Sequence, residues 1–164
     1  MPKLYLAGPI SGLSYEDAAK GWRKEFEDKL LTIDEWSNIE CASPMRGKEF
    51  LAHMERLGHA PAEMDGYQNP MASSHGIATR DSFDVRTSAA MVAYLLEATA
   101  VSVGTVLEIG MAFAHRVPII GVVPKGPHPH EHGMLLSMIQ MNGYLVHTLD
   151  EAVVLAYHLL IPGL

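Results

Sequence analysis

Short apolar segments alternate with helix-forming segments along most of this chain, and this alternation constrains its fold more than any other feature. The sequence predicts strands over residues 3–7, 38–42, 90–95, 117–123 and 144–146. The first of these ends at the turn signal Gly8-Pro9 and is typical of a strand buried on both faces. Strands that alternate with helices imply right-handed crossovers and a mostly parallel sheet of about five strands.

The helices predicted between these strands follow an apolar repeat or a capping pattern. Ser14 has N-cap spacing before a stripe of apolar residues that recurs every four positions from Ala18 to Leu30. Further helices are predicted through residues 50–54 and over 79–88, 103–115, 134–141 and 149 to the C-terminal end. With helices on both faces of the sheet, the expected architecture is a flavodoxin- or Rossmann-like three-layer α/β sandwich.

Loops at one edge of this sheet are where a site is expected, because ligands of such folds bind outside the carboxyl ends of the strands. The rule brings residues 8–14, 43–48, 102–108 and 124–134 together at one mouth. Residues 58–76 lack periodicity and are punctuated by Gly, Pro, Ser and Asn, so they predict a long loop. A loop of this length is usually a lid, a binding loop or a disordered connector.

Charge and cysteine content exclude several classes of protein. The 164 residues carry 12 Lys and Arg against 19 Asp and Glu, a formal net charge of −7 that argues against a nucleic-acid polymer or an anionic membrane as partner. Cys41 is the only cysteine, which precludes an internal disulfide and suggests a reducing compartment. The apolar runs are far shorter than the ~20 residues that span a bilayer, and no signal-peptide pattern is seen. We therefore expect one cytoplasmic domain over residues 1–164.

The segment from Val101 to Gly110 is the most informative candidate site. Gly104 lets the backbone approach a ligand closely, and the free amides of a helix start suit a phosphate. We expect Glu108 in the first turn of this helix, where the helix dipole would lower its pKa and keep it ionised as a nucleophile or general base. Thr105-x-x-Glu108 also has the spacing of a capping box, so Glu108 could instead satisfy backbone donors.

Two further acids, Asp81 and Asp84, precede a strand that should be fully buried. Either one could serve as an acid near the mouth of the site. Either one could equally be an ordinary acid at the start of a helix.

The His-rich segment from Pro127 to His132 suggests a metal site, but we expect none. Its two prolines make a shared tetrahedral geometry awkward, and no Cys or second His pair elsewhere has zinc-like spacing. A loop that borders the site and offers imidazoles for hydrogen bonds explains it better. No Gly-x-Gly-x-x-Gly, Walker-type or Gly-x-Ser-x-Gly motif occurs either, and no cofactor is expected.

Three motifs occur in order along the chain and carry a resemblance to a known family. They are Tyr5-Leu6-Ala7-Gly8-Pro9-Ile10, Arg80-Asp81 and Ser102-x-Gly104-Thr105-x-x-Glu108-x-Gly110-x-Ala112. Together they resemble the nucleoside 2-deoxyribosyltransferase family and its relatives, the deoxynucleoside 5′-monophosphate N-glycosidases. Residues 43–50 also look like a segment common in phage and bacterial members, and the resemblance covers nearly the whole chain.

The resemblance implies cleavage of the N-glycosidic bond of a nucleoside or nucleotide through a covalent glycosyl-enzyme, with transfer to water or to another base. Glu108 matches the family nucleophile and Tyr5 matches the tyrosine that orients it. Asp81 matches the aspartate that assists the departing base, with Asp84 as the second choice. The division of roles is chemically sensible, because a nucleobase is a poor leaving group until a ring nitrogen is protonated.

One departure from the family pattern bears on the substrate. Transferases of free nucleosides often carry an aspartate six residues before the nucleophile, and here that position is Ser102. A carboxylate there would repel a 5′-phosphate, whereas a serine hydroxyl at a helix start would accept one. The full set of predicted substrate-binding residues is Gly8, Ser11, Gly12, Arg46, Asp84, Ser102, Gly104, His130 and Met134.

Sites of this family are completed by a neighbouring subunit, so the resemblance implies a homodimer or higher homo-oligomer with shared active sites. Ser137, His130 or His132 could enter the partner's site. Met134, Met138 and Met141 recur at helical spacing and suit a core or a subunit interface.

Two other functions stay open from the sequence. A non-catalytic nucleotide-binding or sensing domain would keep Gly104 and its helix start, but it would not need Tyr5, Asp81 and Glu108 together. A phosphoribohydrolase of the cytokinin-activating type also uses a Gly-Thr-x-x-Glu turn. Its usual Pro-Gly-Gly run is absent, because Val101-Ser102-Val103 stands in that place.

Overall fold

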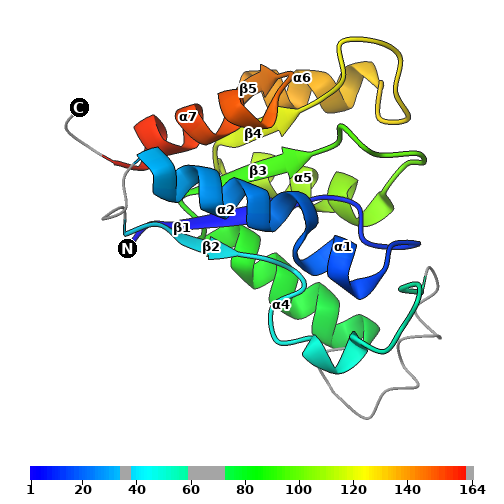
Figure 1. The fold of residues 1–164 in the computed structure, drawn as a ribbon. Coiled ribbons are helices and arrows are strands. Elements are labelled where there is room, and N and C mark those ends of the chain that lie inside the picture. The colour runs from blue at the N-terminus through cyan, green and yellow to red at the C-terminus, as the bar shows by residue number, and fades with distance from the viewer. Residues whose placement is uncertain (34–37, 59–72, 162–164) are drawn as a thin grey trace.

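A five-stranded parallel sheet forms the centre of the computed structural model, which describes residues 1–33, 38–58 and 73–161. Its strands are β1 (Lys3–Ala7), β2 (Glu40–Ala42), β3 (Ala90–Tyr94), β4 (Ile119–Val122) and β5 (Gly143–Val146). They are arranged in the order β2-β1-β3-β4-β5, and all neighbouring pairs are parallel. This is the strand order of flavodoxin-like α/β folds, and the α/β prediction is confirmed (Figure 1).

Helices cover both faces of the sheet (Figure 1). One face packs against α2 (Gly21–Ile33) and α7 (Leu149–Leu160), and the other packs against α4 (Ser74–Thr87), α5 (Val103–Ala114) and α6 (Gly133–Met141). Side chains alternate along β1: Leu4 and Leu6 join the α2–α7 layer, whereas Tyr5 and Ala7 join the α4–α6 layer. Successive side chains of β1 therefore pack against helices on opposite faces of the sheet.

The helix predicted behind Ser14 is two helices, a correction to the sequence analysis. Ser14 caps α1 (Tyr15–Ala19), and α2 begins at Gly21 after Lys20. Glycine is a weak helix former, which makes this a natural place for the interruption. The apolar stripe divides accordingly. Trp22 and the apolar residues after it enter the sheet core, while Ala18 joins a separate cluster with the segment after β2, which includes the short 3₁₀ helix η1 (Glu49–Leu51).

Helix α4 begins five residues earlier than the sequence analysis predicts. The Ser73 side chain accepts a hydrogen bond from the Gly76 amide and so caps the helix at a point inside the expected long loop. Residues 59–72 of that loop lie outside the described residues. The terminal helix α7 has the predicted capping box between Thr148 and Glu151.

None of the helices in the described ranges combines the length and apolar character needed to span a membrane.

Candidate active site

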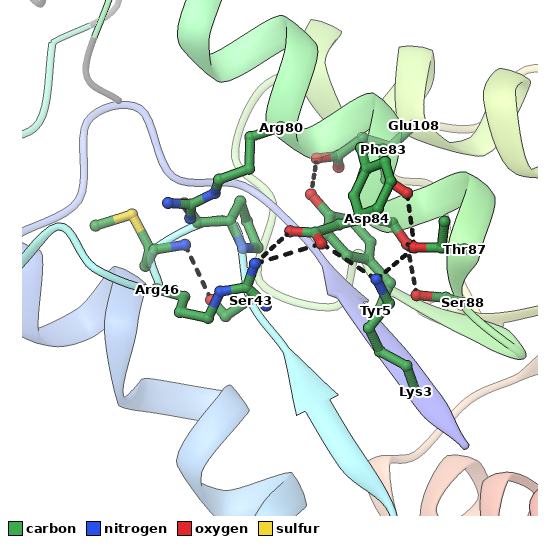
Figure 2. Close-up of polar contacts among 12 residues, drawn as sticks. Lys3, Tyr5, Ser43, Arg46, Arg80, Phe83, Asp84, Thr87, Ser88 and Glu108 are labelled. Atoms are coloured by element: carbon green, nitrogen blue, oxygen red, sulfur yellow. Dashed lines mark hydrogen bonds and ion pairs between the residues drawn. The ribbon is translucent and has the colours of Figure 1, made fainter. Parts of the chain in front are cut away.

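A buried hydrogen bond between Tyr5 and Glu108 is the centre of the candidate site (Figure 2). Tyr5 comes from β1, an inner strand of the sheet, and Glu108 comes from α5, which packs over the same face of the sheet. The Tyr5 hydroxyl donates to Glu108 Oε1 at 2.7 Å, and both side chains are buried. The structure thus brings together two residues that the sequence analysis paired through the family resemblance.

Glu108 is not in the first turn of its helix, so the expected effect of the helix dipole is wrong. Helix α5 begins at Val103 with Ser102 as its N-cap, which puts Glu108 in the second turn and leaves no capping box with Thr105. Burial raises the pKa of the Glu108 carboxyl to about 7, and the hydrogen bond from Tyr5 opposes this rise. At pH 7 the Glu108 carboxyl is therefore partly protonated, whereas the sequence analysis expects it to be fully ionised.

Asp81 is a second buried acid in the same site, and it lies in the middle of α4. The alternative that it is a helix-start acid is therefore wrong, because α4 begins at Ser74. Burial raises the pKa of the Asp81 carboxyl to about 6, and its Oδ1 has no hydrogen-bond partner among the described residues. The Asp81 charge contributes to the raised pKa of Glu108, so the two acids influence each other. A buried acid that titrates near neutrality can hold and release a proton at physiological pH.

Lys48 is a buried cation beside these acids that the sequence analysis did not single out. It follows β2 and is 3 % exposed. Its charge lowers the pKa of Asp81, and burial lowers the pKa of Lys48 itself. The sequence feature that could have identified Lys48 is its position within residues 43–48, one of the four segments predicted at the mouth of the site.

Asp84 is held in ion pairs (Figure 2). Its carboxylate contacts Arg46 Nη2 at 3.0 Å and Lys3 Nζ at 3.2 Å, while its side chain is 2 % exposed. The Arg46 side chain is about half exposed and lies at the surface of this cluster. This arrangement ties α4 to β1 and to the segment after β2, and it favours Asp81 over Asp84 as the reacting acid.

The loop after β1 places Gly8 where a side chain would be crowded. A Cβ at Gly8 would lie 3.1 Å from the Tyr94 carbonyl oxygen and 3.1 Å from Trp22. Gly12 has a positive φ of 87°, which favours glycine, and its amide already donates to the Leu57 carbonyl. Ser11 is exposed between them. The amide of Gly12 is therefore not free to bind a ligand. No hydrogen bond joins Ser11 to Asp81 or Glu108 among the described residues.

The N-terminus of α5 is organised by Ser102 and His130. The Ser102 hydroxyl caps the helix by accepting from the Thr105 amide, and the Ser102 amide donates to His130 Nε2 at 2.8 Å. His130 is buried within its own chain at 1 % exposure, so the expectation that it enters a partner's site is wrong. A Cβ at Gly104 would meet no atom within 4 Å, which leaves open space beside the helix start.

Met134 is not enclosed with the buried acids. Met134 is in the first turn of α6 and is 68 % exposed. Over the described ranges, no group of three or more His, Cys, Asp or Glu side chains is arranged to hold a metal ion.

Arg23 is the other functional candidate that the sequence analysis missed. It is 1 % exposed and its charge interacts with Glu108, Tyr5 and Asp81. The sequence contains a sign of this role, because Arg23 stands three residues before Phe26 and therefore lies on the apolar face of its helix. A charged residue at a core position is an informative exception.

Comparison with known proteins gives the family. The model of the nucleoside 2-deoxyribosyltransferase family matches residues 4–148. The chain belongs to this family. The matched range contains Tyr5, Asp81 and Glu108. No curated protein matches the chain in sequence.

Solved structures show the same fold at low sequence identity. A conserved protein from Enterococcus faecalis has a TM-score of 0.66 at 19% identity, with 94% of this chain and 96% of that chain covered. A CMP N-glycosidase from Clostridium botulinum has a TM-score of 0.52 at 17% identity, with 94% of each chain covered. The nucleoside 2-deoxyribosyltransferase family match and these two structures agree on the α/β fold.

Proposed function

We propose that this protein cleaves the N-glycosidic bond of 2′-deoxynucleosides or their 5′-monophosphates through a covalent ester between Glu108 and C1′ of the sugar. The observation that carries the proposal is the buried 2.7 Å hydrogen bond from Tyr5 to Glu108, with Asp81 close enough for the two acids to influence each other. Membership of the family supports this class of reaction. The fold shared with a CMP N-glycosidase is consistent with a nucleotide substrate.

The proposed reaction has two displacements at C1′. In the first, a carboxylate oxygen of Glu108 forms a bond to C1′ while the bond from C1′ to the base breaks, and the base takes a proton from Asp81. In the second, water or another base bonds to C1′, the ester to Glu108 breaks, and the acceptor's proton returns to Asp81. Two inversions give overall retention of configuration. Tyr5 fixes the carboxylate that attacks, through its hydrogen bond to Glu108.

A substrate panel tests this function directly. The protein would be incubated with ribo- and 2′-deoxyribonucleosides and with their 5′-monophosphates, with and without a second free base, and the products separated by chromatography. Release of free base together with sugar or sugar phosphate indicates hydrolysis, and exchange of bases indicates transfer. Tight nucleotide binding with no base release over hours would overturn the proposal in favour of a non-catalytic binding domain.

The pH dependence of kcat/KM is expected to be bell-shaped, with its maximum between about pH 6 and 7. Activity needs Glu108 ionised, so it rises as pH approaches the raised pKa of about 7. It also needs Asp81 protonated, so activity falls as pH rises beyond the pKa of about 6. Because the two acids interact, the limbs belong to the pair and not to either residue alone. A profile that stays flat from pH 5 to 9 in a stopped-time assay would contradict these roles.

The choice between nucleoside and nucleotide is proposed to depend on Ser102. Ser102→Asp is expected to lower the ratio of kcat/KM for a 5′-monophosphate over its nucleoside by at least ~10-fold, because a carboxylate repels a phosphate in a partly buried site. Aspartate is also a good N-cap, so α5 should keep its start. Ser102→Ala, which loses the cap but adds no charge, is the control. An unchanged ratio in Ser102→Asp would show that the phosphate is not near this residue.

Association of subunits is proposed through the outer face of α5. Val103 is 67 % and Leu107 is 62 % exposed on this helix, although its other side is buried against the sheet. A helix that is apolar on both sides suits an interface. Leu107→Glu is expected to convert an oligomer to a monomer in light scattering after size exclusion, whereas Val154→Glu on α7 is expected not to. A wild-type monomer at micromolar concentration would contradict the proposal.

A further inference from the structure

Arg23 is the largest fully buried side chain in the part of the chain that the structure describes. Its guanidinium donates to three backbone carbonyls: Leu6 at 3.2 Å, Gly8 at 3.2 Å and Ala18 at 2.6 Å. It also lies over the Trp22 ring, 4.8 Å from the ring centroid. The side chain therefore holds the end of β1, the loop after it and the end of α1 together.

These contacts engage all three guanidinium nitrogens but place no anion beside the charge. In the described ranges, Arg23 makes no ion pair with a carboxylate within 4.0 Å. Burial lowers the pKa of Arg23 to about 10, so it is still a cation at neutral pH. A buried cation is costly unless an anion compensates it. The two N–H donors of a glutamine amide could not serve all three carbonyls, and a methionine would fill the space with no donor and no charge.

The carboxylates whose charges act on Arg23 are Glu108 and Asp81, the two acids of the candidate active site. Arg23 binds the β1 backbone at Leu6 and Gly8, while Tyr5 extends into the opposite layer and donates to Glu108. The cation and the carboxylate thus lie on either side of the end of one strand, and both are excluded from solvent. Charges shielded from water interact at longer range than charges at the surface.

We infer that Arg23 is a positioning residue that keeps the Glu108 carboxylate ionised for attack, acting through the end of β1 without touching the substrate. The inference rests on the proposed function, in which Glu108 is the nucleophile. Four groups act on Glu108: the Tyr5 hydroxyl and the charges of Arg23 and Lys48 favour its ionised form, and the Asp81 carboxylate opposes it. Both cations also interact with Asp81, but Arg23 lowers the pKa of Glu108 more than Lys48 does.

The test is a direct titration of Glu108 by carbon-13 NMR of the side-chain carboxyl, assigned by its loss in Glu108→Gln. Arg23→Gln is expected to move the Glu108 midpoint upward by about one pH unit, and Arg23→Lys by much less because it keeps the charge. Arg86→Gln on α4 removes an exposed cation and is the matched control, expected to leave the midpoint in place. Because Glu108 has the higher pKa of the pair, its upward shift should move the alkaline limb of kcat/KM upward and lower the maximum.

A folded Arg23→Gln protein with an unchanged Glu108 midpoint would overturn the inference and leave Arg23 as a structural anchor. If Arg23→Gln does not fold, Arg23→Met fills the same space without a charge and should show the same upward shift. The NMR midpoint is measured without turnover. A protein that lacks glycosidase activity but shows the shift would therefore reject the proposed function and retain the electrostatic link.

Discussion

Glu108→Gln is expected to lower the rate of base release by ~10⁴-fold or more, the largest effect of any single substitution in the chain. Glutamine keeps the volume of the side chain, and its amide oxygen can still accept the hydrogen bond that Tyr5 makes at 2.7 Å. The substitution removes the negative charge and the ability to form an ester with C1′. The rate is measured by chromatography of free base, with the best substrate from the panel.

The same variant separates loss of chemistry from loss of fold. Removing a buried carboxylate whose pKa is raised by burial should leave the melting temperature unchanged or higher at pH 8, where the wild-type carboxyl is ionised at a cost. Rapid quenching followed by mass spectrometry should detect a sugar adduct on Glu108 in the wild-type protein and none in the variant. A stable adduct on another residue would assign the nucleophile elsewhere.

Asp81→Asn is expected to lower base release by about 10²–10⁴-fold, the usual contribution of a general acid. Asparagine fills the same place in α4 but has no proton to give to the leaving base. A substrate whose base is already cationic, such as a 7-methylguanine deoxynucleotide, needs no such proton. On that substrate the variant should therefore be slowed far less than on the unmethylated one.

Asp84→Asn is the matched control for this prediction, because Asp84 is a buried acid one turn further along the same helix. Its carboxylate is paired with Lys3 and Arg46, so the variant should lose about 1–3 kcal/mol of stability. The rate per folded molecule should change little, and the alkaline limb of the pH profile should remain. If Asp84→Asn removed that limb and Asp81→Asn did not, the roles of the two acids would have to be exchanged.

The sequence predicts the fold well because the strands and helices have distinct local patterns. The apolar strand at residues 3–7 and the helix after Ser102 lie where they were expected. The start of α4 was harder to predict, because the cap at Ser73 falls in a stretch without apolar periodicity. The interruption at Lys20 was also missed, since the apolar stripe continues across it and only Gly21 weakens the helix.

The site is predictable in its members more than in its electrostatics. Tyr5, Asp81 and Glu108 were assigned by motif, but the pKa of Glu108 was expected to fall and is raised instead. The difference has one cause. Glu108 lies in the second turn of α5 and is buried, so burial raises its pKa more than the helix dipole lowers it. The sequence marks Arg23 as a charged residue on an apolar helix face and Lys48 as part of a segment at the mouth, but their effect on the acids depends on burial and on neighbours distant in sequence.

The hydrogen bond between Tyr5 and Glu108 joins residues 103 positions apart in the chain. Tyr5 lies on β1, which pairs on one side with β3, a strand that is made much later than β1. Contacts of such separation form slowly, because a long loop must close before they contribute. The pair therefore cannot form until the chain has been made as far as Glu108 and β1 has assembled with α5, so we expect this hydrogen bond to form late in folding.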